Sequence, residues 1–227
     1  MTPLQRQLLL GLRPDQPRTL ENFVAGRNGE LLRGLARLTV PENTGSYYLW
    51  GPPGCGRSHL LAAVTRLARR PAVLSSADEL GHTWTWQPGS LLAVDDVHTL
   101  NDDGQATLFR AFIAARNEGL SLLLSGPVPP LELTLREDLR TRIGQCLIYE
   151  IQPLSDTEKA ATLAQHARER GMALDEAIVP WLLRHGRRDL PSLLATLDAL
   201  DHASLELKRP PTLPLLREVL QLRLETE

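Results

Sequence analysis

Residues 51–58 of the chain read GPPGCGRS, and this stretch determines the class of fold. Two glycines, Gly51 and Gly56, enclose four residues and are followed by a basic residue and a serine. An aromatic, strand-like run at 46–50 precedes the stretch, and a helical run at 58–68 follows it. In a phosphate-binding loop of this spacing, glycines let backbone N–H groups curl around phosphates at a helix N-terminus, and the serine hydroxyl reaches Mg²⁺. The stretch therefore indicates a nucleotide-binding α/β domain.

Arg57 is the departure from this motif, because the usual residue at its position is lysine. Arginine keeps the positive charge, but its guanidinium is bulkier and fork-shaped. Lys159 and Lys208 are the only lysines among 25 basic residues, so a general avoidance of lysine also accounts for part of this choice. Taken alone, the imperfect match leaves a glycine-rich turn without a ligand as an equal alternative.

A second motif favours the nucleotide site. Residues 91–96 read LLAVDD, an apolar strand that ends in two acids. Such a strand brings Asp95 beside the phosphate loop, where it holds magnesium through water, and Asp96 to a position where it orients an attacking water. The alternative is an acidic pair that merely ends a strand. Loop, strand and spacing together favour nucleotide binding over both structural alternatives.

Five short apolar runs alternate with helical stretches in the first two thirds of the chain. This alternation predicts a parallel five-stranded sheet covered by helices on both faces. The runs occupy residues 46–50, 72–75, 91–95, 120–125 and 147–151. From Pro153 onward the strand signals end, and the Ser155–Glu158 capping box begins an all-helical segment. We expect a tail at 1–18, an α/β nucleotide-binding domain at 19–152 and a small helical lid at 153–227.

The composition excludes several classes of protein. With 42% hydrophobic residues and a net charge of −2, the chain is unlike a disordered protein. Its apolar runs are too short for a membrane span, no export signal is visible, and two cysteines form no disulfide framework, so we expect a cytoplasmic protein. The pI near 6.3 gives no electrostatic reason to expect tight binding to nucleic acid.

Several motifs resemble the AAA+ module of the bacterial replication initiator DnaA, over about residues 19–224. They are residues 19–26 (TLENFVAG), the phosphate loop with 58–61 (SHLL), the Asp95–Asp96 strand, 139–142 (LRTR), 151–153 (IQP) and 188–190 (RDL). A narrower resemblance is to the Hda family, DnaA-homologous regulators that inactivate the initiator. It is carried by residues 7–12 (QLLLGL), 57–61 (RSHLL) and 148–156 (IYEIQPLSD), and by a chain that ends before the initiator's DNA-binding helices.

The resemblance implies a role for each matching position. Arg142 matches an arginine finger that reaches into the nucleotide site of a neighbouring subunit. Ser58 and Asp95 match the magnesium ligands, and the bound cofactor is ADP or ATP with Mg²⁺. The nucleotide-binding positions are Phe23, Val24, Pro53, Gly54, Cys55, Gly56, Arg57, Ser58, His59, Asp95, Asp96 and Arg188.

The resemblance also implies partners. Gln7, Leu8, Leu10 and Leu12 match a peptide that binds the sliding clamp, the beta subunit of DNA polymerase III, although Gly11 replaces the family's common proline. A tail that packs its leucines on its own domain is the alternative. DnaA is the second partner, DNA is approached only through the clamp, and no membrane is involved. Whether the chain is a homodimer or a larger homo-oligomer stays open.

We therefore expect a negative regulator of replication initiation that promotes hydrolysis of DnaA-bound ATP and has at most a weak ATPase of its own. One alternative is an autonomous AAA+ ATPase, such as a helicase loader or a remodelling ATPase. The other is a DNA-binding initiator paralogue, against which the near-neutral charge argues. Pro127 and Val128 replace an acidic-basic pair of the family, so the polar sensor after the fourth strand is either Ser125 or absent.

Overall fold

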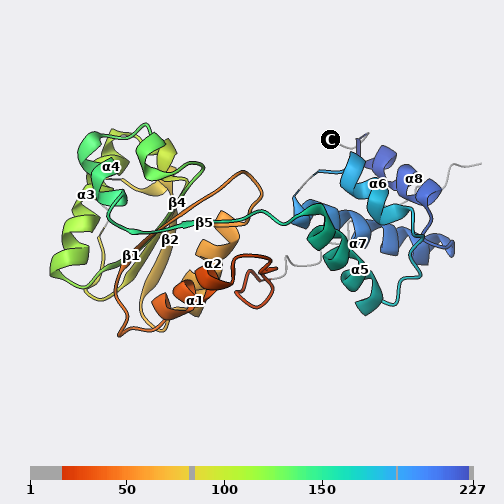
Figure 1. Cartoon of the computed structure of the whole chain (residues 1–227), viewed down its shortest axis with the longest axis horizontal. Coiled ribbons are helices and arrows are strands. Elements are labelled where there is room, and N and C mark those ends of the chain that lie inside the picture. The colour runs from red at the N-terminus through yellow and green to blue at the C-terminus, as the bar shows by residue number, and fades with distance from the viewer. Residues whose placement is uncertain (1–16, 82–84, 188, 225–227) are drawn as a thin grey trace, which may run out of the picture.

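A computed structural model describes residues 17–81, 85–187 and 189–224 of the chain. The chain forms an α/β body that is followed by a group of four helices, α5 to α8 (Figure 1). The predicted clamp-binding residues Gln7, Leu8, Leu10 and Leu12 lie outside the described residues, and so does Arg188.

The body is built on a five-stranded sheet whose strands run in parallel in the order β2-β3-β4-β1-β5. The strands are β1 Ser46–Trp50, β2 Ala72–Ser76, β3 Leu91–Asp95, β4 Ser121–Gly126 and β5 Leu147–Glu150. Each lies within one residue of its predicted run at either end. Because all five strands are parallel, the segments that follow them lie at one edge of the sheet.

Helices cover both faces of the sheet, with α1 and α2 on one face and α3 and α4 on the other (Figure 1). Their bounds, with three short 3-10 helices, are α1 Gly29–Leu38, α2 Arg57–Leu67, η1 Ala77–Glu79, η2 Val97–Thr99, α3 Asp102–Asn117, η3 Pro130–Glu132 and α4 Glu137–Ile143. In α1, Leu31, Leu35 and Leu38 recur at helical spacing and are buried, so this helix forms because one apolar stripe faces the sheet.

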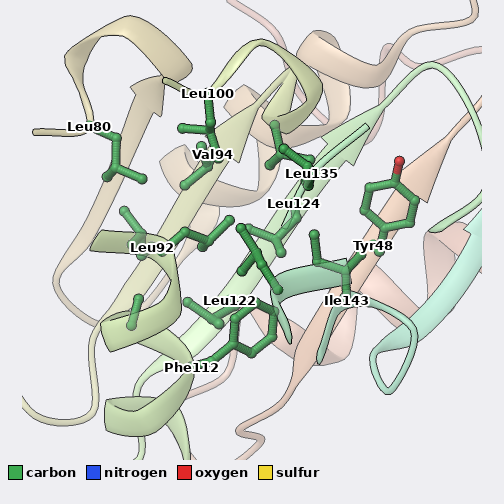
Figure 2. Close-up of a cluster of buried hydrophobic side chains, with 14 of the residues drawn as sticks. Tyr48, Leu80, Leu92, Val94, Leu100, Phe112, Leu122, Leu124, Leu135 and Ile143 are labelled. Atoms are coloured by element: carbon green, nitrogen blue, oxygen red, sulfur yellow. The ribbon is translucent and has the colours of Figure 1, made fainter. Parts of the chain in front are cut away.

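A separate apolar core lies on each face of the sheet. On the α1–α2 face, Leu35, Leu60 and Leu123 are buried together. On the α3–α4 face, Figure 2 shows Leu122 and Leu124 of the sheet among side chains from the helices, including Phe112 and Ile143. The Tyr48 hydroxyl in this core donates a hydrogen bond of 2.7 Å to the Val128 carbonyl.

The two edge strands are less buried than the central strands of the sheet. Val73 of β2 is 46% exposed, and Leu147 and Ile148 of β5 are 54% and 42% exposed. The central strands β3 and β4 are buried almost throughout. An edge strand has a neighbour on one side alone, and the helices do not extend over its outer residues.

The helical lid has its own apolar core, which includes Leu163, Leu182 and Leu197. Its helices are α5 Asp156–Glu169, α6 Ile178–His185, α7 Leu190–Leu207 and α8 Leu213–Leu224. The predicted capping box is present, because the Ser155 and Glu158 side chains each accept from the other's backbone N–H. The apolar pattern predicts the second lid helix over residues 174–185, but the helix begins at Ile178 because the Asp175 carboxylate accepts from the Ala177 N–H and forms a turn.

Within the described part of the chain, no helix combines the length and the apolar character needed to cross a membrane.

Asn28, the residue just before α1, is hydrogen-bonded to the segment that leads into the lid. The Asn28 side chain donates to the Gln152 carbonyl (2.9 Å) and accepts from the Gln152 N–H (2.8 Å). This reciprocal pair fixes the start of α1 against the segment that leads into the lid.

Candidate nucleotide site

The phosphate loop, the acidic pair and Ser125 lie at the same edge of the sheet. The loop follows β1, the acids stand at the end of β3, and Ser125 is near the end of β4, which lies between β1 and β3. In open parallel sheets, ligands bind at the carboxyl ends of the strands, where the order of connection reverses. The fold thus brings together the two motifs that the sequence identifies separately.

The glycines of the loop are required by its shape. Gly54 and Gly56 have φ angles of +77° and +104°, which L side chains rarely adopt. A Cβ at residue 56 would lie 2.6 Å from Cε2 of Phe23, and a Cβ at residue 54 would lie 3.0 Å from the Cβ of Asp189 in the lid. The loop is therefore covered closely by the segment before α1 and by the start of α7.

The remaining loop residues lie in the turn before α2 and at its start. Pro53 and Ser58 are exposed, and Cys55 is partly buried, with its N–H donating 3.2 Å to the Pro52 carbonyl. Burial raises the pKa of the Cys55 thiol, and the positive charge of Arg57 opposes that rise. Successive backbone N–H groups in such a turn, at a helix N-terminus, form a concavity suited to an anion.

Arg57 is the first residue of α2, and its side chain is 13% exposed. It donates to the Gly51 carbonyl and, through Nη2, to Asp96 Oδ1 at 3.0 Å. The arginine therefore connects the start of the phosphate loop with the acid that follows β3. Nearby, burial raises the pKa of the Tyr48 hydroxyl; Arg57 acts to lower this pKa and Asp96 to raise it.

The acidic pair is held by a compact hydrogen-bond network. The Ser125 hydroxyl donates to Asp95 Oδ1 and accepts from the Asp96 N–H at 3.0 Å. The same N–H lies 3.1 Å from Asp95 Oδ1. Asp96 adopts a left-handed conformation with φ of +50°, which aspartate tolerates better than most residues. Ser125, within β4, thus contacts both acids, and its role as the polar sensor stays a prediction.

Phe23, Val24 and His59 flank the loop. The Phe23 and His59 rings lie 5.6 Å apart between centroids and are tilted by 55°. His59 Nε2 lies 2.8 Å from the Thr19 carbonyl, so the histidine ties α2 to the segment at 19–24. Val24 is half-buried in that segment. An apolar ring beside the loop is suited to contact with a nucleotide base.

Arg142 lies on a different element, near the C-terminus of α4. Its guanidinium carbon lies 4.4 Å from the centroid of the Phe109 ring on α3, within range of a cation–π interaction. The neighbouring residues Leu139 and Ile143 are buried in the core and fix the orientation of the helix. Arg142 itself is half-buried. Sequence reasoning identified the arginine but not the aromatic ring beneath it.

Asp189 is a residue of the site that sequence reasoning missed. It caps α7 by accepting from the Ser192 N–H at 2.9 Å, and it packs against Gly54. Burial acts to raise its pKa, but the hydrogen bonds from Ser192 outweigh burial and hold the pKa below its usual range. The sequence signal for this helix cap is an aspartate that stands three residues before a serine at the start of a predicted helix.

The described residues contain no group of three or more His, Cys, Asp or Glu side chains placed to hold a metal ion. Ser58 lies at the exposed start of α2 and Asp95 at the end of β3, and their assignment as magnesium ligands stays a prediction.

Comparison with known proteins adds two findings. Residues 156–220 match the family model described as "Hda, lid domain". Among solved structures, DnaA bound to AMPPCP and single-stranded DNA is similar with a TM-score of 0.67 and 20% identity, over 81% of this chain and 64% of that chain. This chain thus spans less than two thirds of that DnaA chain.

Two other solved structures share the fold. Domain III of DnaA from Thermotoga maritima gives a TM-score of 0.75 at 16% identity, over 91% of this chain and 97% of that one. A RuvB variant from Thermotoga maritima gives 0.70 at 17% identity, over 91% and 72%. The structural likeness establishes the α/β AAA+ fold, and the family match supports the resemblance to Hda: residues 156–220 match an Hda lid domain, and they follow a body with a DnaA-like AAA+ fold.

Proposed function

We propose that the protein is a negative regulator of replication initiation that acts on DnaA. The observation that carries this proposal is the Hda lid domain on a chain with the AAA+ fold of DnaA. These findings support a DnaA-related replication regulator. In more detail, we propose that the chain binds the sliding clamp and adenine nucleotide and donates Arg142 to ATP held by DnaA.

The phosphate loop supports binding of ADP or ATP in the chain's own site. Its left-handed glycines direct backbone N–H groups to one side, and the N-terminus of α2 adds a partial positive charge. Ser58 and Asp95 would hold Mg²⁺, which neutralises phosphate charge when bound. Phe23 and Val24 would contact the adenine, and Arg188 of the lid, outside the described residues, would contact the phosphates.

Arg142 would act in trans. A guanidinium placed against the γ-phosphate stabilises the charge that develops as the bond to the leaving group breaks, and such fingers contribute about 10³ to 10⁵ in rate. Phe109 supports this role because its ring face holds the guanidinium without supplying a negative charge. The reacting ATP would lie in DnaA, so the chain would contribute one catalytic residue and little hydrolysis of its own.

The tail would tether the protein to the clamp. Gln7, Leu8, Leu10 and Leu12 lie outside the described residues, and their role rests on the sequence pattern alone. Leucines of an extended peptide would occupy an apolar pocket of the clamp, with the glutamine amide fixing the entry. Clamp loaded on DNA would then bring the regulator to DnaA without direct DNA binding.

The experiment that tests this function follows hydrolysis of ATP preloaded on DnaA, with clamp on DNA, with and without the protein. We expect acceleration that requires the clamp and is lost in Arg142→Ala. Arg140→Ala is the matched control, since it removes the same side chain from another side of the same short helix. A Gln7→Ala, Leu10→Ala double variant should lose the clamp dependence.

Two results would contradict the proposal. Equal acceleration by wild type and Arg142→Ala would exclude Arg142 as the finger. Absence of acceleration, together with rapid clamp-independent ATP turnover by this chain alone, would instead favour the autonomous AAA+ ATPase, such as a helicase loader or remodeller.

A further inference from the structure

The ion pair between Arg57 and Asp96 lies inside the phosphate-loop site. Arg57 Nη2 and Asp96 Oδ1 are 3.0 Å apart, and the arginine side chain is 13% exposed while the aspartate side chain is 43% exposed. A second donor of the same guanidinium is engaged by the Gly51 carbonyl. Both acceptors are oriented by the fold, so the planar, forked guanidinium is held between two fixed oxygens.

Asp96 is held in place from several directions. Its N–H donates to the Ser125 hydroxyl, and its carbonyl accepts from both the N–H and the hydroxyl of Thr99, each at 2.9 Å. His98 Nδ1 lies 3.8 Å from Asp96 Oδ1, the oxygen that also binds Arg57. These bonds fix the backbone of Asp96 in the turn between β3 and η2, which places its carboxylate within reach of Arg57.

The position of this pair sets up a competition. Arg57 occupies the motif position whose side chain normally reaches the β- and γ-phosphates of a nucleotide. A phosphate group in the loop and the Asp96 carboxylate are both anions that the same guanidinium would bind. A terminal phosphate near Asp96 also meets the repulsion of a like charge.

We propose that Asp96 competes with the phosphates of a bound nucleotide for Arg57 and thereby weakens nucleotide binding at this site. This inference rests on the proposed binding of adenine nucleotide. The side chain at this motif position reaches the β- and γ-phosphates of ATP but only the β-phosphate of ADP, so Asp96 acts more strongly against ATP. Asp96 is thus a specificity-determining residue that acts through Arg57.

The test is a binding titration of the full chain with Mg–ATP and Mg–ADP, in wild type, Asp96→Asn, Arg57→Gln and the double variant. Asparagine also tolerates the left-handed conformation, so Asp96→Asn removes the charge and keeps the turn. The matched control is Glu218→Gln, which neutralises an acid paired at the same 3.0 Å distance with Arg209 in the lid. Circular dichroism checks folding, and Arg57→Met replaces Arg57→Gln if the latter fails to fold.

We expect Asp96→Asn to bind Mg–ATP roughly tenfold more tightly than wild type, as loss of one charged competitor implies, with a smaller gain for Mg–ADP. Glu218→Gln should bind as wild type does. In the Arg57→Gln background the same Asp96→Asn change should have little effect, because the guanidinium for which Asp96 and the phosphates compete is absent.

Unchanged or weaker binding by Asp96→Asn, with wild type binding normally, would overturn the inference and leave nucleotide binding intact. An equal gain in both Arg57 backgrounds would also overturn it, since Asp96 would then act by repulsion alone. Failure of every variant, wild type included, to bind either nucleotide would overturn the nucleotide site itself and this inference with it.

Discussion

The phosphate loop and α4 each contain an arginine that the resemblance assigns to nucleotide chemistry. Arg57 in the loop contacts an anion, whereas Arg142 in α4 contacts a neutral ring. Arg57 lies at the start of α2, largely buried, between the Gly51 carbonyl and the Asp96 carboxylate. Arg142 lies over the ring of Phe109 at 4.4 Å and makes no ion pair among the described residues. One guanidinium is compensated by a full negative charge, and the other rests on a neutral aromatic face.

The difference concerns where positive charge is available. A carboxylate at 3.0 Å compensates a guanidinium, whereas a ring face fixes its position and leaves its charge in place. The charge of Arg57 is therefore compensated within the chain, whereas the charge of Arg142 is not, which is what the proposed role in trans requires. Each region also carries one free cysteine, Cys55 in the loop and Cys146 just after α4, which serves as a local reporter.

The largest effect is expected from Gly56→Ala, which alters the loop immediately before Arg57. The new Cβ would combine a φ of +104° with a contact of 2.6 Å to Phe23. Strain and overpacking of this kind together lower the free energy of unfolding by about 3 kcal/mol. Urea denaturation measures the loss. Gly89→Ala is the control, since Gly89 has a φ of +72° and nothing within 4 Å of the new Cβ. Equal losses in both variants would show that Phe23 does not constrain the loop.

Ser125→Ala is expected to have the next largest effect, because it removes a hydroxyl that bridges the two acids. Ser125 is fully buried, donates to Asp95 and accepts from the Asp96 N–H. Loss of this bridge leaves buried polar groups short of a partner, at a cost of about 2 kcal/mol in the free energy of unfolding. Ser75→Ala is the control, because Ser75 is equally buried but makes a local bond to the next residue's carbonyl. A loss no greater than that control's would contradict the bridging role.

Most of the fold was predictable because its signals are local. The apolar runs gave each strand, the Ser155–Glu158 capping box gave the start of the lid, and the loop spacing gave the strand–loop–helix unit. The exposure of Val73 and Leu147 was not predictable, since an apolar run does not reveal whether its strand is central or at an edge. Strand order depends on which strands pair, and those partners are distant in sequence.

The candidate site was predicted as a set of residues but not as a set of contacts. Arg57, Asp95 and Asp96 were identified from motif spacing, yet the pairing of Arg57 with Asp96 follows from the placement of β4 between β1 and β3. Asp189 and Phe109 were missed because their partners, Gly54 and Arg142, are remote in sequence. A motif reports what one segment contains, whereas a side-chain partner depends on tertiary structure.

Phe109→Leu tests the aromatic support of Arg142. Leucine keeps most of the apolar volume but removes the ring face, so the guanidinium loses a cation–π interaction worth about 1 kcal/mol. We expect hydrolysis of DnaA-bound ATP at saturating protein to slow roughly fivefold. Ile113→Ala is the control, since Ile113 lies one turn further along α3 and is 43% exposed. Loss of binding to DnaA with an unchanged saturated rate would assign Phe109 to the contact surface and not to the position of Arg142.

The smallest expected effects are changes in the reaction rates of two thiols. Cys55 reports on the phosphate loop and Cys146 on the end of α4. Burial raises the pKa of Cys55, with Arg57 opposing the rise, and burial raises the pKa of Cys146 to about 12. Because the thiolate reacts, the rate with a disulfide reagent should increase with pH, and Cys55 should react before Cys146 as the pH is raised from 7 to 10.

Asp96→Asn leaves the charge of Arg57 uncompensated, so the Cys55 pKa falls and Cys55 reacts roughly two- to fivefold faster, while Cys146 is unaffected. The Cys55→Ala and Cys146→Ala variants separate the two rates. An equal acceleration at both thiols would mean that Asp96→Asn loosens the whole body and does not act locally through Arg57.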